Sequence, residues 1–447
     1  MKYLILILVT GLAIFIKPWE LNTADNDLAL EPDSLSDTSL LPSPSDILLP
    51  TNQVINNKDS ELEITRKFDL LIQKFMDKWE LKGASFALMK DDRLIYCKGY
   101  GYADVEQNIP MDVMHVFRIA SVSKLITAVG IMKLQEEGKL HLNDIVFGPS
   151  GILNDSIFSE IKDSRTKKIT VEHLLRHQGG YSNTYGDPMF CPLDIARKMN
   201  VTPPADLTTI IRFVLSRRLR FTPGESTSYS NIGYGILSRI IEKASGESYE
   251  SYIRKHILVP AGCFDMHLGK NLYEDKLPNE VRYYEVSNAE EIPACDGSGQ
   301  LVPRSNGGNN IEELYGAGGW VASPSELLRF LAVIDGNPVI QDILTPASIQ
   351  YMTQSIPHSL PIGWIETNNT GEWVRTGTLA GTSALMKKQS DGYSWVFLTN
   401  TSSWKGSHFP NYIALAVDKA MSTVGQWPQR DLFEMQSTCH EKLLVTR

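Results

Sequence analysis

The chain has 447 residues, of which 42% are hydrophobic and 21% are charged, a composition typical of a globular protein with a large core. Its 43 basic and 52 acidic residues give a net charge of −9, and no segment is dense in Lys or Arg. Because nucleic-acid binding depends on positive charge that neutralises phosphates, this composition argues against a nucleic-acid partner.

The first twenty residues, MKYLILILVTGLAIFIKPWE, have the pattern of an export signal. Lys2 precedes an apolar run over residues 3–16, and Lys17 follows it. The run is short for a membrane span and suits the apolar core of a secretory signal. We therefore expect residues 1–20 to be a signal peptide or, because no small-x-small cleavage site is clear, an N-terminal membrane anchor. The protein is expected to be exported, to the periplasm or the extracellular space.

Residues 21–60 differ in composition from the rest of the chain. They are rich in Ser, Asp, Pro and Leu, contain no Lys or Arg before Lys58, and have no aromatic residue. This composition predicts a flexible linker, with an ordered arm packed on the body as the alternative. A single domain is predicted over residues 61–425, followed by a C-terminal tail over residues 426–447.

The cysteine pattern argues against metal and redox motifs. The chain has five cysteines without a C-x-x-C pair, at Cys97, Cys191, Cys263, Cys295 and Cys439. This spacing excludes a zinc knuckle, and no metal or other cofactor is expected. The absence of a cysteine before Cys97 argues against a lipid anchor, and the pairing of disulfides stays open.

The ordered elements begin with an amphipathic helix and a hairpin. Residues 61–81 carry apolar side chains at helical spacing, and Gly83 ends this helix. Residues 84–104 are predicted to form two strands joined at Asp91–Asp92. A further helix starts at Ser121 and stops near Gly138.

Helical patterns fill the middle of the chain, and strands return near its end. Residues 171–246 are mainly helical, residues 383–400 indicate two strands around an Asp391–Gly392 turn, and residues 413–424 a final helix. Strands from both chain ends around a helical middle predict an α+β fold, an α/β sandwich. We expect one mixed, mostly antiparallel sheet flanked by helices, with an all-helical subdomain inserted.

The stretch RIASVSKLITAV, residues 118–129, contains the first candidate for chemistry. Ser121 heads a long apolar helix, and Lys124 follows one turn later on the same side. Burial and the helix dipole both favour a neutral amine at Lys124, which could accept the Ser121 proton. The alternative is a helix-capping serine beside a lysine that reaches solvent. Three other Ser-x-x-Lys motifs lack an apolar helix behind them, at Ser159, Ser164 and Ser402.

A tyrosine and an asparagine precede another apolar helix. In TSYSNIGYGIL, Tyr229 could relay protons, and Asn231 could hold a substrate carbonyl and Lys124. The alternative is an N-cap asparagine with a packing tyrosine. A second Tyr-x-Asn motif, Tyr181 with Asn183, is the weaker candidate because no apolar helix follows it.

The third candidate lies where a strand should precede the final hairpin. Here Arg375, Thr376 and Gly377 form a basic-Thr-Gly triplet, and Gly377 would let a substrate backbone approach closely. The backbone N–H groups of Thr378 and Ser121 could form an oxyanion hole. The alternative is a surface strand with a glycine bulge.

Two other patterns are weak. His173 and His177 have the i, i+4 spacing of metal ligands, but Leu174 stands where a zinc-protease helix has its glutamate. Structural histidines are therefore favoured. No G-x-S-x-G motif surrounds Ser226, which argues against an α/β-hydrolase.

The order of the three candidate motifs resembles that of penicillin-recognising serine enzymes, in particular the class C β-lactamase-related branch. The resemblance covers about residues 64–424 and is closest over residues 101–144, 169–181, 221–253 and 316–331. It implies a β-lactamase/transpeptidase-like fold with a site between sheet and helical subdomain. It also implies Ser121 as acylated nucleophile, Lys124 as its base, Tyr229 in proton transfer and Asn231 in substrate orientation.

One position departs from the family pattern. The third motif of the family has Lys or His where this chain has Arg375, which stays charged and cannot exchange protons but could hold a substrate carboxylate through two nitrogens. No carboxylate analogous to the deacylating Glu of class A enzymes is identified. The sequence thus predicts a serine hydrolase acting on a small molecule or peptide, that is, a β-lactam, a D-amino-acid peptide or a small ester. The alternative is a catalytically silent binding or regulatory module, and the oligomeric state stays open.

Overall fold

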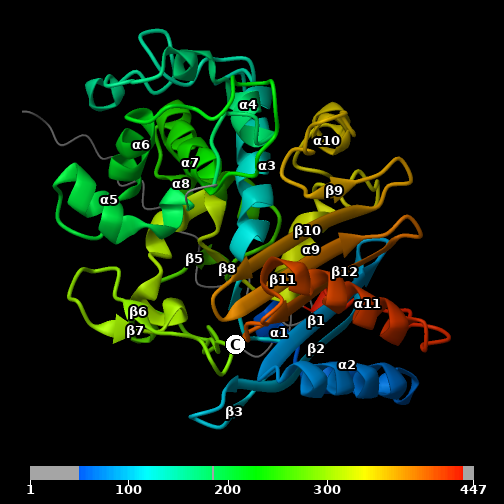
Figure 1. Cartoon of the computed structure of the whole chain (residues 1–447). Coiled ribbons are helices and arrows are strands. Elements are labelled where there is room, and N and C mark those ends of the chain that lie inside the picture. Colours follow the sequence, from blue (N-terminus) through cyan, green and yellow to red (C-terminus); the bar gives the residue numbers. More distant parts are fainter. Residues whose placement is uncertain (1–49, 184–185, 436–447) are drawn as a thin grey trace, which may run out of the picture. The chain divides into compact units, whose positions relative to one another are not determined.

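The computed structural model describes residues 50–183 and 186–435, and these form a sheet with helices on both faces and a helical region beside it (Figure 1). The predicted signal segment, most of the linker and Cys439 lie outside the described residues. The four described cysteines, Cys97, Cys191, Cys263 and Cys295, are all unpaired. No helix within the described ranges is long and apolar enough to cross a membrane.

The main sheet has seven strands in the order β3-β2-β1-β12-β11-β10-β9. Their bounds are Gly83–Lys90 (β1), Arg93–Asp104 (β2), Ile109–Pro110 (β3), Glu366–Thr367 (β9), Trp373–Leu379 (β10), Thr382–Lys388 (β11) and Tyr393–Thr399 (β12). Strand β1 pairs with β12 with Ala84 opposite Thr399, so both ends of the chain build one sheet as predicted. All its strand pairs are antiparallel, so the prediction of a mixed sheet was wrong on this point.

Alternation along the strands gives the sheet two apolar faces. Phe86 and Leu88 of β1 belong to a cluster with helices α2 (Arg66–Trp79) and α11 (Phe409–Met421), which lie side by side on one face (Figure 1). Ala87 and Met89 belong to the larger core on the other face, where α9 (Pro324–Ala332) packs against β1 and β12. This period of two is what a strand buried on both faces requires.

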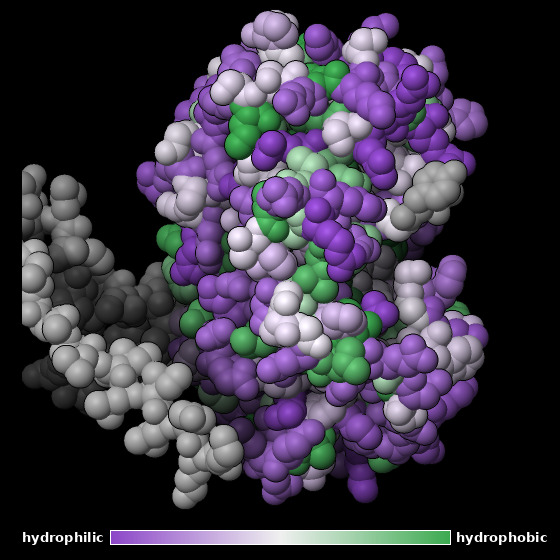
Figure 2. Space-filling model, turned by 60° about the vertical axis from the view of Figure 1, so that its left-hand side comes forward, coloured by the Kyte–Doolittle hydropathy of each residue, from purple (hydrophilic) through white to green (hydrophobic). Residues whose placement is uncertain are grey.

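Helix α3 (Ser123–Glu136) connects the sheet side to the helical region, where it packs against α7 (Asn231–Ser245). The remaining helices are α1 (Thr51–Val54), α4 (Val171–Leu175), α5 (Pro192–Met199), α6 (Leu207–Leu215), α8 (Tyr249–Ile253) and α10 (Pro346–Thr353). Two small sheets complete the fold, one of β4 (Phe117–Arg118), β8 (Trp320–Ala322) and β5 (His267–Leu268), the other of β6 (Ile292–Pro293) and β7 (Leu301–Val302). The face shown in Figure 2 is mostly hydrophilic, with hydrophobic residues in separate patches.

The domain extends beyond both predicted boundaries. In the segment assigned to the linker, Asn57 binds Gly99 and Met111 through its side chain, and the Ser60 hydroxyl accepts from the Cys97 N–H. In the segment assigned to the tail, the Trp427 ring packs 5.4 Å from that of Phe68. Short-range composition missed these segments because their order comes from contacts with distant strands.

Removal of the Asn57 side chain tests whether this early segment belongs to the domain. Asn57→Ala removes the acceptor of the Gly99 N–H and the donor to two carbonyl groups. Because partly buried polar groups lose their partners, we expect the free energy of unfolding to fall by about 1–3 kcal/mol in urea titrations. Exposed Lys58, mutated to Ala, is the matched control. Equal midpoints for the two variants would show that the segment adds nothing to the fold.

Candidate active site

Ser121 is the only residue between positions 115 and 132 that is not buried. It lies in a 3₁₀ turn, Ala120–Val122, directly before α3, so the α-helix begins two residues later than the sequence predicted. Ala120 has a φ of +48°, a strained conformation for a residue with a side chain. The turn therefore presents one hydroxyl to solvent from an otherwise buried segment.

Lys124 is completely buried, and its amine has three acceptors. Its Nζ lies 3.1 Å from the Ser121 Oγ, 2.6 Å from the Asn231 Oδ1 and 2.5 Å from the Ala317 carbonyl oxygen. Burial lowers the pKa of Lys124, the neighbouring Tyr229 opposes this shift, and the charge of Arg375 adds to it. A neutral amine would donate its two hydrogens to the two shorter contacts and direct its lone pair at the Ser121 hydroxyl.

Asp187 determines how the Asn231 amide is oriented. The Asn231 Nδ2 donates to the Asp187 Oδ2 at 2.6 Å, which leaves the Oδ1 facing Lys124. The N-cap of α7 is Ser230, whose hydroxyl accepts from the Gly233 N–H, so Asn231 does not cap the helix. The sequence reasoning missed Asp187, because it lies 44 residues before Asn231 in a loop without a motif.

Arg375 binds the backbone of Ser121. Its Nε and Nη2 donate to the Ser121 carbonyl oxygen at 2.8 and 2.6 Å, and the Nη2 also donates to the Tyr229 hydroxyl at 2.9 Å. The sequence predicts a guanidinium that binds a substrate carboxylate through two nitrogens. In the structure two of its three nitrogens already bind the protein, and the side chain is 1% exposed.

Tyr229 lies between two basic side chains, Lys124 and Arg375. Burial raises the pKa of its hydroxyl, but the charges of Arg375 and Lys124, with hydrogen bonds from Ser121 and Lys124, outweigh burial and lower the pKa to about 8. Its ring stacks on the imidazole of His177 at a centroid distance of 4.3 Å. The phenol is thus held rigidly, with a pKa suited to proton transfer near neutral pH.

His177 is a second residue whose place at the site was missed. Its Nδ1 accepts from the Ser230 N–H, and burial lowers its pKa well below the ordinary value, so the imidazole is neutral. His173 points elsewhere and accepts from the Thr170 N–H. Within the described ranges no group of three His, Cys, Asp or Glu side chains could hold a metal ion.

Gly377 allows β10 to lie directly against the Ser121 turn. A Cβ at this position would be 2.3 Å from the Ile119 carbonyl oxygen and 2.9 Å from the Ser121 nitrogen. The close approach is therefore made by the protein's own backbone, whereas the sequence predicted a substrate there. Along β10, Arg375 and Gly377 are buried, while Thr376 and Thr378 are half-buried.

The predicted residues thus converge from distant parts of the chain on one buried polar network. Ser121, Lys124, Tyr229, Asn231 and Arg375 are joined by direct hydrogen bonds. Thr376, Gly377 and Thr378 lie on the adjoining strand. Asn183 of the weaker Tyr-x-Asn motif also lies close, since its Nδ2 is 3.4 Å from the Tyr229 carbonyl oxygen.

Comparisons with known proteins identify the family of this chain. The beta-lactamase family model matches residues 68–418, and the chain belongs to this family. Protein flp of Staphylococcus aureus (strain MW2) is 31% identical over 196 residues, which are 44% of this chain and 36% of that protein. Penicillin-binding protein 4* of Bacillus subtilis (strain 168) is 31% identical over 217 residues, 48% of this chain and 43% of that protein. These matches span less than half of the curated relatives' length.

Solved structures show the same α+β architecture. An octameric penicillin-binding protein homologue from Pyrococcus abyssi has a TM-score of 0.60 at 27% identity, covering 82% of this chain and 78% of that one. A D-amino acid amidase from Ochrobactrum anthropi SV3 has a TM-score of 0.62 at 20% identity, covering 81% and 99%. EstCE1, a hydrolase with promiscuous acyltransferase activity, has a TM-score of 0.63 at 20% identity, covering 84% and 99%. At these last two identities the likeness concerns the fold alone.

Gly377→Ala tests the contact between β10 and the nucleophile turn. The added methyl group would collide with two backbone atoms, so we expect a loss of about 1–3 kcal/mol in the free energy of unfolding, measured in urea. Gly425→Ala is the control, since a Cβ there meets nothing within 4 Å. Unchanged stability in Gly377→Ala would contradict the close packing.

Proposed function

We propose that this protein is a serine hydrolase that cleaves an ester or amide through an acyl-enzyme. The observation that carries the proposal is the buried amine of Lys124, whose two shorter contacts are to acceptors and whose third is to the Ser121 hydroxyl. An alcohol is a weak nucleophile at neutral pH, and an adjacent base is the usual means of activating it. Membership of the beta-lactamase family supports the same chemistry.

The reaction follows from the arrangement of donors and acceptors. Lys124 takes the Ser121 proton while the Oγ attacks the substrate carbonyl carbon, and the carbonyl oxygen becomes an oxyanion. Collapse breaks the bond to the leaving group, which receives the proton from Lys124 by way of Tyr229. Water then attacks the acyl-enzyme, releases the acid and restores the Ser121 hydroxyl.

The backbone N–H groups of Ser121 and Thr378 are proposed to stabilise the oxyanion. The proposal is supported by the close approach of the two segments, since a Cβ added at Gly377 would lie 2.9 Å from the Ser121 nitrogen. Donors preorganised in this way are each worth about 10²–10³ in kcat. Arg375 acts beside them as a fixed positive charge.

The substrate is proposed to be a β-lactam, a D-amino-acid peptide or a small ester. The names of similar proteins include a penicillin-binding protein, an amidase and a hydrolase with acyltransferase activity. These names support a reaction at an acyl group, but they do not single out one substrate. Asp187, the carboxylate in the described network, is hydrogen-bonded to Asn231. It is therefore not placed as a base for deacylation, and slow release of the acyl group is expected with β-lactams.

A fluorophosphonate or a fluorescent penicillin should label Ser121. We expect one adduct, mapped by mass spectrometry to the peptide that contains this residue, and none in Ser121→Ala. Ser402→Ala is the control, because Ser402 also precedes a lysine by three positions but lacks the buried site. A folded wild-type sample without an adduct, whose ester turnover equals that of Ser121→Ala, would instead favour the catalytically silent module.

The rate of labelling should increase with pH. Lys124 is a base only when neutral, and a lowered pKa places more of that form near neutral pH, so the rate rises as the proton is lost. A step near pH 8 is expected from Tyr229 and should be absent in Tyr229→Phe. Lys124→Arg, which stays protonated, should lower the rate about 10²–10⁴-fold at every pH, with Lys133→Arg as control. A rate that falls between pH 6 and 9 would exclude this base.

A further inference from the structure

A cavity of about 580 Å³ lies outside the catalytic network and has no lining residue in common with it. Three segments form its wall: residues 78–82 at the end of α2, residues 285–288, and residues 401–404 after β12. The Lys82 N–H donates to the Thr401 Oγ1 at 2.8 Å, which joins the first segment to the third. The Ser402 N–H donates to the Tyr284 carbonyl oxygen at 2.8 Å, which fixes the start of the second segment. The cavity is therefore formed before any ligand binds.

Two indole rings form one side of this cavity. Trp79 and Trp404 both line it, and their ring centroids are 5.8 Å apart. Trp79 is held in place by α11, since its ring lies 5.0 Å from that of Phe409 and 5.1 Å from that of Tyr412. Trp404, in contrast, is 71% exposed. Apolar burial stabilises in proportion to the area removed from water, so most of the Trp404 ring is left for a ligand to cover.

The rest of the wall is polar and has hydrogen-bonding groups to spare. Within the described part of the chain, no hydrogen bond or ion pair engages four of the lining side chains, Glu80, Lys82, Ser287 and Asn288. These side chains offer both donors and acceptors. The charges in the lining balance, because two lysines are matched by two glutamates, Lys78 and Lys82 with Glu80 and Glu285. The wall thus has no net charge that would select an ionic ligand.

We propose that this cavity binds a neutral saccharide, with one sugar ring stacked on Trp404 and the sugar hydroxyl groups bonded to the polar wall. One face of a pyranose ring presents C–H groups with partial positive charge, which the negative face of an indole attracts. The Trp404 ring already attracts a positive group, since the Lys405 Nζ lies 3.9 Å from its centre, and a stacked sugar would replace this contact.

The polar wall distinguishes a sugar from other ligands. Sugar hydroxyl groups donate and accept, so they can satisfy carboxylate, ammonium, amide and hydroxyl side chains at once. An apolar ligand would leave these groups without partners, at a cost in desolvation. The proposal goes beyond the proposed hydrolysis, because the cavity and the network around Ser121 have no residue in common.

Titration of the full chain with neutral tetrasaccharides tests the proposal. The probes are chitotetraose, cellotetraose and maltotetraose, and binding is followed by calorimetry and by tryptophan fluorescence. We expect at least one of them to bind, and Trp404→Ala to raise its dissociation constant about tenfold. Trp404→Tyr keeps an aromatic face and should bind within about threefold of the wild type. Asn288→Ala, which removes only polar groups, should weaken binding about threefold to tenfold.

Leu415→Ala is the matched control, because Leu415 is also 71% exposed but does not line the cavity. It should leave the dissociation constant unchanged, and all variants should keep the thermal midpoint of the wild type. If none of the three sugars binds at about 10 mM, the proposal is wrong. It is also wrong if Trp404→Ala binds the sugar as tightly as the wild type does.

Vesicles distinguish a sugar site from a membrane contact, since exposed Trp and Lys side chains also suit a lipid interface. Sedimentation of the full chain with vesicles of phosphatidylcholine and phosphatidylglycerol should be the same for the wild type and Trp404→Ala. Loss of vesicle binding in Trp404→Ala, without binding of any sugar to the wild type, would assign this surface to a membrane and overturn the proposal.

Discussion

Burial of one amine is the constraint on which the site depends. Lys124 is completely buried, so its hydrogens and its lone pair need partners supplied by the protein. These come from Ser121 before α3, Asn231 at the start of α7 and Ala317 near β8. The amine is satisfied only when these three segments are docked, which links folding of the helical region to assembly of the catalytic geometry.

Arg375 gives this site a fixed electrostatic character. Its charge lowers the pKa of both Lys124 and Tyr229. Burial has a larger effect than Arg375 on each group, and it lowers the pKa of Lys124 but raises that of Tyr229. Lysine or histidine in its place could exchange protons, but a guanidinium keeps its charge over the working pH range. In the proposed reaction, proton transfer is therefore left to Lys124 and Tyr229, and Arg375 holds the phenol and the Ser121 carbonyl in place.

Sequence patterns predicted those parts of the structure that depend on local order. Strand alternation and the Asp91–Asp92 and Asp391–Gly392 turns predicted the two hairpins, and the three motifs predicted most of the network. Asp187 and His177 were missed because their roles come from contacts with residues 44 and 52 positions away. Gly377 was identified as a position of close approach, but its contact with the Ser121 turn was not predicted. Only the folded sheet brings Gly377 against that turn.

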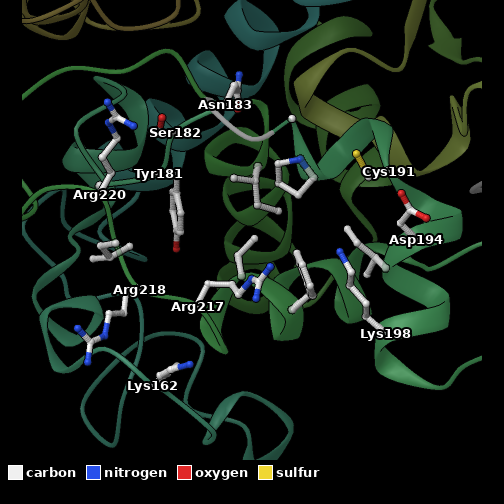
Figure 3. Close-up of a pocket in the computed structure, with 18 residues that line it drawn as sticks. Lys162, Tyr181, Ser182, Asn183, Cys191, Asp194, Lys198, Arg217, Arg218 and Arg220 are labelled. Carbon is white, nitrogen blue, oxygen red and sulfur yellow. The ribbon is translucent and has the colours of Figure 1, made fainter.

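The charges of the site and of a cavity in the helical region have the same sign. Arg375 is positive beside Ser121, and the lining of a cavity between α5 and the end of α6 includes five Lys or Arg side chains (Figure 3). In the proposed reaction, the fixed positive charge of Arg375 would stabilise the oxyanion that forms when Ser121 attacks a carbonyl group. The charge of Arg375 also lowers the pKa of Tyr229, so one cation would support both the oxyanion and the proton transfer of the proposed reaction.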